Sequence, residues 1–151
     1  MSDSVPEQPL SAHQPRWRAF DEQWYLLRYP EVRDWMHEEG HRDLYAFYLE
    51  TGQRYGHSPN RYFDEIWYRE AYPDVRRDLI QEKWQSGFEH YCAEGYRQNS
   101  PHWLFDESGY HRRYPELTRR NLDEHGFVNG YDHYLEVGEA SYYRGHQFLD
   151  R

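Results

Sequence analysis

One stretch of the chain has the residue types for metal chemistry. His37-Glu38-Glu39-Gly40-His41 fits the H-E-x-x-H pattern of zinc peptidases. On a helix the two imidazoles would share a face one turn apart, and the glutamate would activate a metal-bound water. Gly40 weakens such a helix by about 1 kcal/mol relative to alanine. His37 and His41 are therefore only a weak candidate for a zinc site, and we expect no metal and no cofactor.

Three carboxylate pairs could in principle serve as general acid and base: Asp21-Glu22, Asp64-Glu65 and Asp106-Glu107. Each pair follows a phenylalanine and precedes a helical pattern. There the aspartate would accept hydrogen bonds from the unpaired first amides, and the glutamate would favour the positive end of the helix dipole. Because the same pair serves this role three times, we predict no catalytic residues and no enzyme.

Four tryptophans do not recur at equivalent positions and are the candidate binding residues. Exposed indole rings can stack on sugar rings or anchor a protein partner. The alternative is that these rings close gaps beneath loops. The four residues are Trp17, Trp35, Trp84 and Trp103.

The elements that must position these side chains come from a tandem repeat. Phe-Asp-Glu occurs three times, each time followed by Tyr-Pro, and Tyr48, Tyr91 and Tyr134 recur with a spacing of 43 residues. Periods of this size are typical of stacked supersecondary units that present a continuous surface, which favours binding over catalysis. His37 and His41 have no histidine counterparts in the other copies. The predicted repeats span about 20–62, 63–104 and 105–147.

Each repeat is predicted to form two or three short helices. The aspartates of the Phe-Asp-Glu motif would cap the first helix, and the Tyr-Pro step would end it. Pro30, Pro73 and Pro115 would then open the second helix. Asp43, Ser86 and Asn129 would cap the third. Valine and isoleucine are scarce and no strand-length alternation appears, so we predict an all-α tandem array of three ~43-residue repeats.

Composition narrows the class of protein further. Apolar residues make up 37% of the chain but aromatic residues 19%, so the core must be aromatic. The net charge of −9 argues against a nucleic-acid partner. No apolar run approaches the roughly 18 residues that cross a bilayer, so we expect no membrane insertion and a cytoplasmic location. Pro6, Pro9 and Pro15 indicate a disordered leader over residues 1–16, before a single repeat domain at 17–151.

The motifs resemble a bacterial repeat of the form Phe-Asp-x-x-Trp-Tyr-Leu, Tyr/Asn-Pro-Asp-Val, then His-Tyr, a glycine and Ser/Asn-Pro. The first part matches Phe20 to Leu26. The middle copy carries the whole pattern, in Phe63 to Tyr68, Tyr72 to Val75, His90-Tyr91, Gly95 and Ser100-Pro101. Members of this family are mostly segments appended to glycosyltransferases, sulfotransferases and other proteins of surface-polysaccharide synthesis. The resemblance implies no particular catalytic or binding residue.

These observations lead to a functional expectation with two alternatives. We expect a non-catalytic recognition or scaffolding module that docks a protein, such as a glycosyltransferase, in bacterial surface-polysaccharide assembly. The first alternative is direct binding of a glycan by aromatic platforms flanked by Asp, Asn and Arg. The second is a zinc-dependent hydrolase at His37, Glu38 and His41. The sequence leaves the oligomeric state open.

Overall fold

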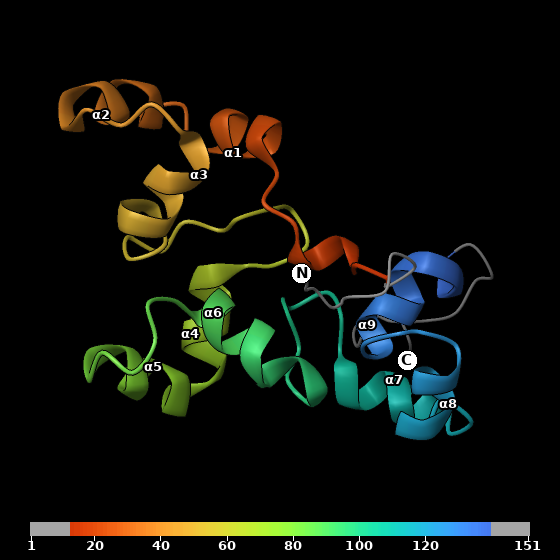
Figure 1. Cartoon of the computed structure of the whole chain (residues 1–151). Helices are drawn as coiled ribbons and strands as arrows, with labels where there is room; N and C mark the ends of the chain where they lie inside the picture. The colour runs from red at the N-terminus through yellow and green to blue at the C-terminus, as the bar shows by residue number, and fades with distance from the viewer. Residues whose placement is uncertain (1–12, 140–151) are drawn as a thin grey trace, which may run out of the picture.

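The computed structural model describes residues 13–139, and within that range its regular structure is helical. An isolated bridge between His102 and Phe105 is the sole β feature of these residues. The all-α fold class is therefore confirmed. The helices follow one another in three sets of three, which we call the first, middle and third units (Figure 1).

The three units share the same order of elements. The first unit contains α1 (Glu22–Arg28), α2 (Val32–Glu39), α3 (Leu44–Phe47) and the π-helical turn η2 (Tyr48–Gly52). The middle unit contains α4 (Glu65–Ala71), α5 (Pro73–Ile80), α6 (Gly87–Ala93) and the 3-10 turn η3 (Gly95–Arg97). The third unit contains α7 (Glu107–Arg113), α8 (Arg119–Glu124), α9 (Gly130–His133) and the π-helical turn η4 (Tyr134–Gly138). A 3-10 turn, η1 (Arg16–Arg18), precedes them.

Most of the predicted caps are present. Asp21 and Asp64 each accept a hydrogen bond from the amide three residues later, and so do the caps of the third helices, Asp43, Ser86 and Asn129. The prediction is wrong for Asp106, whose side chain makes no capping bond. Its carboxylate lies against Gly109, in the place that a Cβ would fill, where the other units have tryptophan.

The prolines of the Tyr-Pro step open a helix in one unit only. Pro73 is the first residue of α5. Pro30 lies two residues before α2 and Pro115 four residues before α8, which Thr118 caps instead. For those two prolines the prediction is wrong, because the chain makes an extra turn before the helix begins.

The recurring Tyr-Pro and Ser-Pro steps join each unit to the next. The amide of Ser58 donates to the Tyr29 hydroxyl at 2.8 Å, and the amide of Ser100 donates to the Tyr72 hydroxyl at 2.7 Å. The hydroxyl oxygens of both serines then accept from the first amide of the next helix. One pair of residues therefore fixes both the end of a unit and the start of its neighbour.

The core is aromatic, as the composition predicted, and it forms two clusters. The first unit has its own cluster, built on Tyr25, Val32, Phe47 and Tyr48. The middle and third units share the other, which includes Trp17, Phe63, Tyr91 and Phe105. Trp17 precedes the first unit in sequence, yet its segment runs back beside α9 of the third unit (Figure 1).

The predicted disordered leader is too long. His13 Nε2 lies 2.7 Å from Asp132 Oδ1, and Arg16 Nε lies 3.0 Å from a Glu136 carboxylate oxygen. Residues 13–16 are therefore packed on the third unit, because the burial of Trp17 beside them fixes their path. Residues 1–12 and 140–151 lie outside the described part of the chain, as do the start of the leader and the end of the predicted domain.

Candidate functional site

Trp17 is not available to a partner. Its side chain is fully buried, its ring lies edge-on to Tyr91 with centroids 4.8 Å apart, and its Nε1 donates to Asn129 Oδ1 at 3.3 Å. The expectation that this ring serves as a surface anchor is corrected by this burial. The burial of this ring could not be predicted from the sequence, because Tyr91 and Asn129, which contact its side chain, lie more than 70 residues away along the chain.

The other three candidate tryptophans differ in burial and in their neighbours. Trp35 is partly buried, packs edge-on to Phe47 and donates to a Glu39 carboxylate oxygen at 2.8 Å. Trp84 is also partly buried and lines a hollow of about 410 Å³ together with Arg54, Arg69 and Arg76. Trp103 is 48% exposed. The hollow beside Trp84 is lined by none of the other three candidate rings.

The H-E-x-x-H stretch does not form the helical face that a zinc peptidase needs. Helix α2 ends at Glu39, and Gly40 adopts a left-handed conformation with φ 76°. The amide of His41 donates back to the Met36 carbonyl, which completes a helix C-cap. His41 therefore lies beyond the helix that carries His37 and Glu38, and the helical geometry that the weak zinc candidate would need is not formed.

Within residues 13–139, one group of side chains has donor atoms close enough together to hold a metal ion. It comprises His13, Asp132 and Glu136, with ligand atoms within 4.8 Å of one another. Arg16 already pairs with Glu136 at 3.0 Å and His13 with Asp132 at 2.7 Å. These contacts explain the cluster as a link between the N-terminal segment and the third unit.

Two of the expected dipole carboxylates have a different role. Glu65 is fully buried and accepts from the amides of Gly87 and Phe88, at 2.6 and 3.0 Å, and from Arg69 Nε at 2.6 Å. It therefore caps α6 rather than its own helix. Burial raises the pKa of this carboxyl, and its donors oppose the shift.

Glu107 repeats this arrangement in the third unit, where it accepts from the first two amides of α9 and from His111. The first unit has no buried glutamate of this kind, and its counterpart Glu22 is exposed. The difference between the units is explained by the first residue of the third helix. A Cβ at Gly87 would lie 3.0 Å from a Glu65 carboxylate oxygen, and the first unit has Leu44 at the equivalent position. A glycine as the first residue of the third helix, as at Gly87 and Gly130, is therefore the sequence feature that indicates a buried carboxylate.

Each unit also contains a buried tyrosine bonded to a histidine. The tyrosine hydroxyl lies 2.6 to 2.8 Å from imidazole Nδ1 in three pairs: Tyr25 with His57, Tyr68 with His90, and Tyr110 with His133. His90 and His133 precede the recurring tyrosine in sequence. In the first unit Phe47 occupies that position, and the histidine that contacts Tyr25 is His57, from the loop after the third helix. The tyrosine–histidine contact is therefore made by a histidine at a different sequence position.

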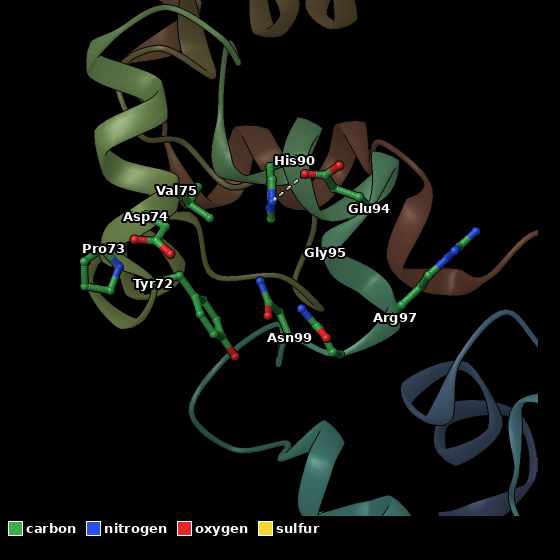
Figure 2. A pocket seen from close by; sticks show the side chains of 10 residues that line it. Tyr72, Pro73, Asp74, Val75, His90, Glu94, Gly95, Arg97 and Asn99 are labelled. Atoms are coloured by element: carbon green, nitrogen blue, oxygen red, sulfur yellow. Dashed lines mark ion pairs between the residues drawn. The ribbon is translucent and has the colours of Figure 1, made fainter.

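The middle unit extends its pair into a chain of hydrogen bonds. Asn99 Nδ2 donates to the Tyr68 hydroxyl at 2.9 Å, so that hydroxyl donates to His90 Nδ1 and leaves Nε2–H facing Glu94 at 3.4 Å. His90 and Glu94 line an open hollow of about 540 Å³ with Asp74 and Arg97 (Figure 2). Its polar walls can bind a polar group, while both imidazole nitrogens are already engaged.

The single thiol of the chain has an inert environment. Burial raises the pKa of Cys92 to about 12, which keeps the sulfur protonated at neutral pH. Cys92 lines a groove where the first unit meets the middle unit. Its side chain can therefore form part of a binding surface, but it is not an activated nucleophile.

We call that groove the open junction groove. It encloses about 370 Å³ between the α3–η2 segment and α6. Its aromatic and aliphatic wall includes Tyr45 and Leu49, which are 46% and 42% exposed. Glu89 and Arg18 supply charge at its edge. The remaining lining residues are Phe20, Tyr48, Gln53, Pro59, Phe88, Cys92 and Ala93.

A second groove at this junction has a different character. It encloses about 480 Å³ and is lined by Trp24 and Trp67, both partly buried, together with polar residues. We call it the tryptophan groove. Its polar lining residues include Arg28, Asn60, Arg61, Asp64 and Glu70.

The histidine pairs lead to a prediction of pH dependence. Burial lowers the pKa of His57, His90 and His133. As pH falls through 6.5, the unfolded chain binds protons before the folded one, so these groups make the fold less stable in acid. His111 acts in the opposite sense, because its hydrogen bond to Glu107 raises its pKa.

We therefore expect His57→Gln to reduce the fall in melting temperature between about pH 7.5 and pH 5.5. The exposed His125 gives the matched control, and His125→Gln should leave that fall unchanged. Thermal melts followed by circular dichroism at both pH values test this. An equal fall in His57→Gln and wild type would contradict it.

Comparison of the chain with protein-family models, with curated proteins and with solved structures gives no match. Over residues 13–139 the helices are too short and too polar to span a bilayer.

Proposed function

We propose that the chain is a non-catalytic recognition module that docks a protein partner through the open junction groove. The observation that carries the proposal is a preformed groove with exposed Tyr45 and Leu49 on its wall. Central aromatic and aliphatic contacts with charged residues at the rim are typical of protein interfaces. The buried carboxylates and histidines support the same reading, because internal hydrogen bonds already engage them.

The resemblance to repeats of bacterial polysaccharide proteins suggests the setting. We propose that the partner is a protein of surface-polysaccharide assembly, such as a glycosyltransferase, and that it is met in the cytoplasm. The shape of the chain suits this role, because successive units hold their grooves in fixed relation through the Ser58–Tyr29 and Ser100–Tyr72 bonds.

The test is capture of partners from lysate of the native host with three tagged proteins. Wild type and Leu27→Asp should recover the same partner, because Leu27 is 83% exposed and lies outside the groove. Leu49→Asp should lose it, because a carboxylate on the wall opposes docking of an apolar side chain. A partner recovered equally by all three proteins would contradict the proposal.

Direct glycan binding is the second candidate, and the tryptophan groove favours it. Two indole rings with Asn, Asp and Arg side chains beside them offer both stacking surfaces and hydrogen-bond groups for a sugar. Carbohydrate analysis of the same eluates separates the two candidates. Carbohydrate bound by wild type and by Leu49→Asp, without a protein partner, would favour the glycan.

A further inference from the structure

The hollow beside Trp84 differs in chemistry from both grooves described above and shares no lining residue with either. It encloses about 410 Å³, within the range of roughly 300–1,000 Å³ that is typical of small-molecule sites. The loop after η2 supplies Arg54, and α4 supplies Arg69. The other lining residues, from α5 and the connector after it, are Arg76, Leu79, Ile80, Glu82, Trp84 and Gln85. We call it the arginine hollow.

Two of its three arginines have guanidinium groups without a partner. Within residues 13–139, neither the Arg54 side chain nor the Arg76 side chain makes a hydrogen bond or an ion pair. Their basic neighbours differ, because Arg77 and Lys83 both contact the Asp78 carboxylate. Guanidinium groups bind carboxylate, sulfate and phosphate oxygens through paired N–H groups. The hollow therefore offers an anion two unsatisfied donors, in a chain whose net charge is −9.

The third arginine is already held in position. Arg69 Nε donates to a Glu65 carboxylate oxygen at 2.6 Å, and its Nη2 donates to the Gln53 carbonyl at 2.8 Å. These two bonds fix the guanidinium plane and leave its remaining N–H groups for a ligand. A donor that is fixed before binding lowers the entropy that a ligand must overcome.

The repeat itself does not account for these residues. The positions of Arg69 and Arg76 are occupied by Leu26 and Arg33 in the first unit, and by His111 and Thr118 in the third. Only the middle unit thus has arginine at both positions.

Glu82 is a second departure from the repeat. It adopts a left-handed conformation with φ 61° where α5 ends, and its counterparts in the other units are Gly40 and Gly126, with φ 76° and 81°. Glycine is the usual residue at such a helix end, because a side chain there is strained. The middle unit therefore keeps a carboxylate at the edge of the arginine hollow against the backbone preference.

The rest of the wall suits a sugar ring. Trp84 is partly buried, lies edge-on to His90 with centroids 5.4 Å apart, and offers an aromatic surface for stacking. Glu82 and Gln85 can accept hydrogen bonds from sugar hydroxyls. The Glu82 carboxylate and the net charge of −9 oppose a ligand with many negative charges, such as an acidic peptide. A hydroxylated ring with a single negative charge fits these features best.

We infer that the arginine hollow binds an acidic saccharide unit, whose carboxylate or sulfate group lies on Arg54 and Arg76 and whose ring packs on Trp84. This site is separate from the open junction groove, so the inference does not depend on the docking function proposed above. The two together would let one module hold a protein and an acidic sugar at the same junction.

Titration of the full chain with four small probes, followed by NMR of the indole N–H signals, tests the inference. The probes are glucuronic acid, glucose 6-sulfate, glucose and inorganic sulfate. Trp84→Phe removes one of the six indole signals and so assigns it. We expect glucuronic acid or glucose 6-sulfate to shift the Trp84 signal with a Kd of roughly 1 mM. Glucose and inorganic sulfate should each bind at least about tenfold more weakly, and the tighter acidic sugar identifies the anionic group.

Variants of the arginines locate the site. Arg76→Ala should weaken binding about tenfold, as expected for the loss of a charge-assisted hydrogen bond, and Arg54→Ala with Arg76→Ala should abolish it. Arg33→Ala is the matched control, because Arg33 is the exposed counterpart of Arg76 in the first unit, and it should match wild type. Circular dichroism checks that each variant is folded.

Several results would overturn the inference. Equal binding of glucose would show that the arginines do not select an anion, and equal binding of inorganic sulfate would indicate an adventitious ion only. Tighter binding of a triglutamate peptide would assign the hollow to an acidic protein segment. No shift of the Trp84 signal up to about 50 mM sugar, or a Kd that the double arginine variant leaves unchanged, would also contradict it. Because Leu49 does not line the arginine hollow, partner capture through Leu49 can succeed or fail independently of these outcomes.

Discussion

Glu65→Ala is expected to lower the free energy of unfolding by about 3–5 kcal/mol, the usual cost of removing one member of a buried ion pair. The change would leave Arg69 without its carboxylate and the first two amides of α6 without an acceptor. Each buried amide that loses its partner adds its own desolvation cost. Urea unfolding followed by circular dichroism measures the difference.

The chain provides a matched control for this variant. Glu22 is the counterpart of Glu65 in the first unit and is exposed, so Glu22→Ala should change stability by less than about 0.5 kcal/mol. Glu107→Ala should resemble Glu65→Ala, because Glu107 caps α9 in the same way. Similar small losses for all three variants would show that the buried carboxylates do not hold the third helices in place.

Trp17→Ala is the second change with a large expected effect, a loss of about 3–5 kcal/mol as for other fully buried tryptophans. It removes the ring that packs between Tyr91 and Tyr96 and the hydrogen bond to Asn129, the cap of α9. Thermal and urea unfolding both report the loss.

Trp103 supplies the control for Trp17, because it is 48% exposed. Trp103→Ala should cost less than half as much as Trp17→Ala. The same comparison decides which tryptophans remain candidates for binding. A melting temperature for Trp17→Ala within a degree or so of wild type would contradict the burial of its ring.

The local features of the fold could be predicted from sequence, because they depend on residues close together in the chain. Asp64 caps α4 three residues ahead, and Pro73 opens α5, by rules that act within one turn. The H-E-x-x-H stretch does not form a continuous helix, and the reason is local as well. A glycine can either weaken a helix from within or end it as a left-handed C-cap, and Gly40 ends α2.

The candidate sites depended on contacts between distant residues, and these the sequence did not reveal. The hydrogen bond between Trp17 and Asn129 spans 112 positions, so Trp17 looked like an isolated ring before the first repeat. The open junction groove is formed by two units together. Tyr45 and Leu49 come from the first unit and Phe88 from the middle unit, and their spacing in the sequence does not show that they meet.

The measurement that tests the central claim most directly is capture of host partners with wild type, Leu27→Asp and Leu49→Asp, each checked for folding by circular dichroism. We predict that wild type and Leu27→Asp recover the same protein and that Leu49→Asp loses it, because Leu49 lies on the wall of the open junction groove. Recovery of that protein by all three would contradict the claim that the junction between the first and middle units is the docking site.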